Sequence, residues 1–224
     1  ISGEETAING NVVVADGSEK TPAAVVITDS ATVDGSITNN SSVSSVAVIG
    51  GATLTGEVKT NEKSGPVYVE GNENSSTGVA MSERTGLVSK DLNSAITAAQ
   101  DKDTITLLQN IDKPSELKTG TTSGSNISLL SITKSVTIKG NGYGIAITMP
   151  KEATDRSQAI SVGSETNKNI TVTLDDVDLT INGNSSDTDK GDAIDVWGTL
   201  NITNGSNITV EKAQSAFTMQ GGKG

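Results

Sequence analysis

The first third of the chain repeats itself at a fixed interval of 21 residues. Residues 25–27 (VVI), 46–48 (VAV) and 67–69 (VYV) are each 21 positions apart, and residues 31–37 (ATVDGSI) return as 52–58 (ATLTGEV). Within each repeat apolar residues alternate with polar ones, which is the periodicity of a strand. A fixed period of this length is typical of stacked repeat proteins, in which each repeat packs only on its neighbours. We therefore expect two or three short strands per repeat, with like strands lying over like.

A looser repeat of about 30 residues runs through the last half of the chain. We expect three strands in each of three coils, and hence three parallel sheets. The expected strands are residues 135–139, 145–148 and 159–162, then 170–174, 177–181 and 193–196, then 200–203, 208–210 and 216–219. The expected inner ladders are Val136, Ile170 and Leu200, and Ile147, Leu179 and Val210.

Short corners rich in Gly and Asn leave an antiparallel alternative open. Residues 140–144 (GNGYG) and 204–207 (NGSN) contain Asn-Gly pairs, which are a strong signal for β-hairpins. The repeat favours the parallel arrangement, because equivalent strands of successive coils can pair directly, at about 4.8 Å per coil.

The composition limits both the core and the function. One Phe, one Trp and two Tyr leave Val, Ile, Leu and Ala to fill the interior, which suits a narrow aliphatic core. The absence of Cys and His removes disulfides, thiolate metal sites, the usual zinc ligand and the usual general base. A net charge of −11 disfavours nucleic acid as a partner, and no stretch approaches the roughly 20 apolar residues of a membrane span.

One amphipathic helix is expected between the two repeat blocks, over residues 91–100. Its start is capped by Ser89 or Asp91, and a strand of period two follows at residues 104–108. The apolar face consists of Leu92, Ala95, Ile96 and Ala99.

Residues 94–108 (SAITAAQDKDTITLL), followed by 135–148 (SVTIKGNGYGIAIT), resemble the entry to the β-helix in bacterial surface proteins of the pectate-lyase-like superfamily. The resemblance covers roughly residues 87–224. It implies an all-β fold, a right-handed parallel β-helix (β-solenoid) with one short capping α-helix, and a secreted or cell-surface location. The expected domains are 1–82, a solenoid-like segment with the 21-residue repeat, and 83–224, the helix and the three-stranded coils.

The last expected coil has no terminal cap in the sequence. The chain stops at residues 219–224 (MQGGKG), within the third strand of that coil. Because an uncovered coil end is a set of sheet edges, we expect the remainder of a longer chain or a neighbouring molecule to cover it.

Enzymes of the resembled superfamily that cleave acidic glycans are implied to carry an Asp cluster for calcium and a basic residue on one sheet face. The outward positions of the expected strands are mostly Thr, Asn and Asp, and the two arginines, Arg84 and Arg156, lie outside these strands. The pattern therefore argues against lyase activity and leaves enzymatic function open.

Two weak candidate sites remain. Asp187, Asp189 and Asp192, in the acidic segment 182–192, are close enough in sequence to offer oxygen ligands to calcium, although an ordinary solvated loop explains them as well. Trp197 closes an expected strand beside Asp195, so that Trp197, Asp195 and Asp192 form a candidate glycan-binding group. The alternative is an indole that covers local core.

These observations favour a non-enzymatic structural or adhesive module that presents binding sites for glycans or host and cell-surface ligands. The alternative is a glycan-binding or polysaccharide-degrading domain of the lyase or hydrolase kind. Fold alone does not choose between them, because one fold carries many functions.

Overall fold

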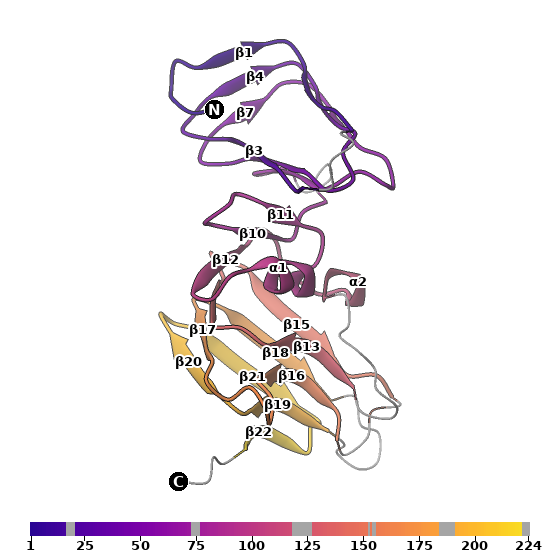
Figure 1. Ribbon diagram of the computed structural model, residues 1–224, viewed down its shortest axis with the longest axis vertical. Helices are drawn as coiled ribbons and strands as arrows, with labels where there is room; N and C mark the ends of the chain where they lie inside the picture. Colours follow the sequence, from indigo (N-terminus) through magenta and orange to yellow (C-terminus); the bar gives the residue numbers. More distant parts are fainter. Residues whose placement is uncertain are drawn as a thin grey trace. The chain divides into compact units, whose positions relative to one another are not determined.

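The computed structural model describes residues 1–16, 21–72, 77–117, 127–151, 153, 156–183 and 191–220, most of them in short strands and the turns between them (Figure 1). The chain forms two compact units, Ile1–Lys90 and Asp91–Gly224. The sheets are parallel within each stack, so the chain belongs to the all-β class.

The first unit places every third strand in the same sheet. The three sheets are β1 (Ala7–Asn9), β4 (Thr32–Asp34) and β7 (Thr53–Leu54); β2 (Val12–Val14), β5 (Ile37–Asn39) and β8 (Val58–Lys59); and β3 (Ala24–Ile27), β6 (Ser45–Val48) and β9 (Val67–Val69). Val25, Val46 and Val67 pair in register, which confirms the 21-residue repeat. The inner side chains, including Ile27, Val33 and Ile37, form an aliphatic core.

A hairpin follows this stack and departs from the repeat. Strands β10 (Ala80–Ser82) and β11 (Val88–Ser89) are antiparallel, and Val88 N donates to Ser45 Oγ at 2.9 Å. Ala47 and Tyr68 lie on the face of β6 and β9 away from the core cluster, yet both are buried. The hairpin therefore packs on an apolar outer face of this unit.

The second unit carries its strands in three parallel ladders. The helices are α1 (Leu92–Ala98) and α2 (Pro114–Leu117). The ladders are β12 (Asp103–Leu107), β14 (Val136–Lys139), β17 (Thr171–Asp175) and β20 (Thr199–Thr203); β13 (Ser128–Ile132), β16 (Gln158–Val162), β19 (Asp192–Val196) and β22 (Ser215–Met219); and β15 (Gly144–Thr148), β18 (Asp178–Asn182) and β21 (Asn207–Glu211). Ile111 bridges to Ile145, so β12, Ile111 and β13 make an additional first coil.

Each of the two expected inner ladders contains one residue that is shifted by two positions from the observed register. Val136 pairs with Val172, not Ile170, and Ile147 pairs with Ile181, not Leu179. A shift of two residues keeps the side chain on the same face of a strand, so alternation alone does not distinguish the two registers.

Helix α1 forms where the apolar pattern predicts it. Asp91 is the N-cap, and its carboxylate accepts a hydrogen bond from Ser94 N at 2.7 Å, so Asp91 rather than Ser89 caps the helix. At the other end Lys134 Nζ donates to two carbonyl oxygens of the last turn, both at 2.6 Å, which places a cation at the negative end of the helix dipole. The helix contacts β13 of the first coil. Its buried residues are Leu92, Ala95 and Ile96.

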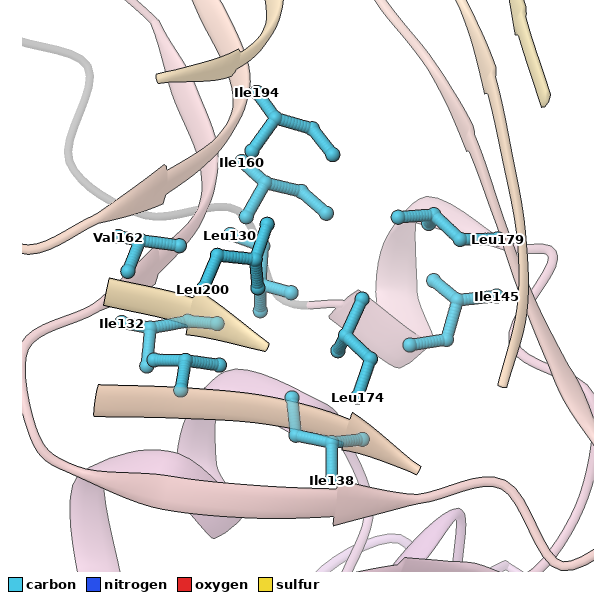
Figure 2. A pocket seen from close by; sticks show the side chains of 11 residues that line it. Leu130, Ile132, Ile138, Ile145, Ile160, Val162, Leu174, Leu179, Ile194 and Leu200 are labelled. Atoms are coloured by element: carbon cyan, nitrogen blue, oxygen red, sulfur yellow. The ribbon is translucent and has the colours of Figure 1, made fainter. Parts of the chain in front are cut away.

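The interior of the second unit is lined by aliphatic side chains from all three ladders, which Figure 2 shows pointing toward one another. The last coil is less covered than those before it. Ile194 is 1% exposed, whereas Phe217, its partner in the next coil, is 42% exposed. Likewise Val196 is 2% exposed and its partner Met219 is 67% exposed.

Candidate functional site

The structure brings together part of the group that the sequence predicts around Trp197. Asp192 opens β19, Asp195 lies within it, and Trp197 follows its last residue. Asp187 and Asp189 lie outside the described residues, so the structure does not test the calcium prediction at those two positions. Asp195 and Trp197 are joined by a hydrogen bond and lie at the centre of the site.

Asp195 is a buried carboxylate, 3% exposed, with a donor on each oxygen. Its Oδ2 accepts a hydrogen bond from Trp197 Nε1 at 2.8 Å, and its Oδ1 accepts one from Gln220 Nε2 at 2.9 Å. A buried charge without such partners would be strongly unfavourable. The carboxylate thus fixes the indole ring and ties the residue that follows β22 to the preceding coil.

Trp197 is half-buried, and one cation lies against its ring. Lys168 Nζ is 5.2 Å from the ring centroid, which is within the range of a cation–π interaction. Lys168 comes from the loop between β16 and β17. A Cβ added at Gly163, in the same loop, would lie 3.4 Å from Trp197 Cβ and 2.5 Å from Asn167 O, so this loop packs closely beside the tryptophan.

A row of small polar side chains continues the site along the ladder. Ser161 is the register partner of Asp195, and Thr218 follows on the other side. Ser161 Oγ is 3.0 Å from Ser128 Oγ and 3.2 Å from Ser131 Oγ, so these hydroxyls hydrogen-bond to one another. Sequence reasoning missed Ser161, Lys168 and Gln220, because their proximity to Trp197 depends on the register between coils.

Asp192 is placed by its backbone and by its position in the ladder. Its backbone N donates to Ser157 O at 2.8 Å, and it stands in register with Gln158 and Ser215. In the described part of the chain, no three acidic side chains converge as a metal site would require.

The buried carboxylates of the described residues all accept hydrogen bonds from the protein. Asp91 accepts from Ser94 N in the first turn of α1, and Asp103 accepts from Gln100 N just after the helix. Glu116 accepts from Asp112 N at 3.1 Å and from Lys113 Nζ at 3.0 Å. The hydrogen bond to Glu116 raises the pKa of Lys113 above its ordinary value. These acids hold turns and helix ends, which is a structural use.

Comparison with protein-family models, curated proteins and solved structures gives no match for this chain. Within the described residues, neither helix has the length and apolar character needed to cross a bilayer.

Proposed function

We propose that the chain is a non-enzymatic structural or adhesive module of a secreted or cell-surface protein, built as a right-handed parallel β-helix of the pectate-lyase-like kind. The observation that carries the proposal is the use of outward polar side chains to tie one coil to the next. These ties are Thr53 Oγ1 to Thr32 Oγ1 (3.2 Å), Thr55 Oγ1 to Asp34 Oδ1 (2.8 Å), Asn207 Nδ2 to Asp178 Oδ1 (2.9 Å) and Gln220 Nε2 to Asp195 Oδ1 (2.9 Å).

Side chains engaged in this way stabilise the stack and are not free to bind a substrate or move a proton. A general acid or base needs a carboxyl group within reach of a substrate, whereas Asp195 is 3% exposed and has both oxygens occupied. Stacked repeats stabilise one another through nearest-neighbour contacts, which suits a module that spaces or presents other parts of a protein.

A polysaccharide depolymerisation screen, run with and without calcium, tests the non-enzymatic part of the proposal. We expect no release of reducing ends or unsaturated products from acidic or neutral glycans. Asp195→Asn serves as the matched control, because it changes the charge at the centre of the candidate site. Depolymerisation by the unchanged chain would overturn the proposal, whether or not Asp195→Asn abolishes it.

Mechanical unfolding tests the structural part. If the second unit carries load as a stack, pulling its ends in a force spectrometer should release coils in steps of about 30 residues, or roughly 100 Å of extended chain. Extension at low force without discrete steps would contradict a load-bearing role.

Glycan binding at Trp197 is the second candidate, and the half-exposed indole held by Asp195 is the observation that favours it. A ring fixed by a buried carboxylate loses little freedom when a sugar stacks on it.

Because Trp197 is the only Trp in the chain, its fluorescence reports on this site alone. Titration with neutral and acidic oligosaccharides should shift the emission, and Trp197→Ala should remove binding on a glycan array; an unchanged emission throughout would exclude this candidate.

We further propose that a neighbouring protein surface covers the last coil, which β20, β21 and β22 form. Its inner row is exposed at Ile202, Phe217 and Met219. Sedimentation of the chain over a range of concentrations should show association that Met219→Lys weakens and Val13→Lys, at another exposed apolar position, leaves unchanged. Association that Met219→Lys leaves intact would contradict this role.

A further inference from the structure

Four Asn-Gly pairs occur in the chain, at Asn9, Asn141, Asn182 and Asn204. Such a pair is the peptide sequence most open to spontaneous deamidation, because glycine has no side chain to hinder attack by its own backbone nitrogen. Whether a given pair reacts in a folded protein depends on what holds that nitrogen. The structure gives the four pairs different surroundings.

The glycine nitrogen is held by another coil in three of the four pairs. Gly10 N donates to Asp34 O at 3.0 Å, and Gly183 N donates to Glu211 O at 2.7 Å. Gly142 N donates to Asp176 Oδ2 at 3.3 Å, a longer bond to a side chain. In the fourth pair, Gly205 N has no acceptor among the described residues, and both Asn204 and Gly205 are exposed.

We propose that Asn204 is the preferred deamidation site of this protein and that the reaction loosens the last coil. Gly205 N attacks Asn204 Cγ and forms an N–C bond that closes a succinimide ring, while the side-chain nitrogen leaves as ammonia. Water then opens the ring at either carbonyl, which gives aspartate or isoaspartate. The net change is the gain of one water and the loss of one ammonia.

Deamidation of Asn204 removes a hydrogen bond that joins two coils. Asn204 Nδ2 donates to Asp175 Oδ1, from the preceding coil. Deamidation replaces this donor with a carboxylate, so an attraction becomes a repulsion between like charges. The isoaspartate form also adds a methylene group to the backbone at a corner where Asn204 has a φ of 51°, close to the φ of 56° at the equivalent Asp176 of the preceding coil.

Peptide mapping by mass spectrometry tests the site. The folded chain is incubated at mildly alkaline pH, and a sample in denaturant gives the intrinsic rate of each pair. The rate of each pair in the folded chain is divided by its rate in denaturant. This ratio should be about five- to tenfold higher for Asn204 than for Asn9 and Asn182, which is the factor expected for one protecting hydrogen bond. The ratio for Asn141 should lie between these values. Protection of Asn204 equal to that of Asn9 and Asn182 would overturn the assignment.

Hydrogen exchange tests the consequence. Asn204→Asp introduces the product charge without waiting for the reaction, and Asn141→Asp is the matched control at the equivalent corner of an earlier coil. Exchange in residues 199–220 should be faster in Asn204→Asp than in the unchanged chain, and unaltered in Asn141→Asp. Equal exchange in the two variants would show that the contact with Asp175 does not hold the last coil.

Discussion

Single glycines at the corners of the second unit set how closely successive coils approach. A Cβ added at Gly140 would lie 1.7 Å from Asp176 O, which is backbone of the next coil, whereas a Cβ at Gly142 would meet nothing within 4 Å. Gly142 instead has a φ of 83°, so alanine there is strained only by its own backbone. We expect Gly140→Ala to lower the free energy of unfolding by about 3 kcal/mol, and Gly142→Ala by about 1 kcal/mol. Chemical denaturation measures both, and equal losses would contradict close stacking at this corner.

Asp195, which the sequence places in a candidate glycan-binding group, accepts a side-chain hydrogen bond on each carboxylate oxygen in the structure. Asp195→Asn retains one acceptor oxygen but turns an amide NH₂ toward a donor, either Trp197 Nε1 or Gln220 Nε2. We expect a loss of about 1–3 kcal/mol in the free energy of unfolding, because a half-buried donor loses its partner on a buried carboxylate. The emission of the single Trp should move as well. A variant with unchanged stability and emission would show that the carboxylate does not hold the indole.

At the scale of elements, α1 depends on one cap that the sequence left undecided between two residues. Asp91 accepts from Ser94 N, whereas the structure gives the Ser89 side chain no part in the helix. Asp91→Ala should therefore lower the free energy of unfolding of the second unit by about 1 kcal/mol, and Ser89→Ala should leave it within about 0.5 kcal/mol. Thermal unfolding of the two variants side by side checks this difference, which would vanish if Asp91 were not the cap.

Strand positions and sheet assignment follow from the sequence, because alternation and a fixed repeat are local signals. The pairing of Val25 with Val46 is an example. The first coil was missed, because Ile111 makes only an isolated bridge and leaves no strand pattern. The hairpin over Ala47 and Tyr68 was also missed, since nothing in a strand's own alternation says which segment covers its outer face. The site beside Trp197 was predicted only in part, because Ser161, Lys168 and Gln220 are far from Trp197 in sequence and are brought near it only by the register between strands.

At the scale of the whole molecule, each inner side chain of a parallel ladder is covered by its register partners in the neighbouring strands, so the cost of a substitution should depend on the position of its strand in the ladder. The ladder Ile160, Ile194 and Phe217 places the same inner position in three successive coils. The first two are 4% and 1% exposed, and Phe217 is 42% exposed.

Truncation along this ladder should therefore give unequal losses. Ile194→Ala should lower the free energy of unfolding by about 2–5 kcal/mol, because it leaves a cavity between two covered coils. Phe217→Ala removes a larger side chain but should cost only about 1 kcal/mol, because much of that side chain already contacts solvent. Denaturant titration followed by circular dichroism measures both losses. Both losses are compared at concentrations at which the chain sediments as a monomer, and a loss at Phe217 equal to that at Ile194 would then contradict the gradient in exposure along this ladder.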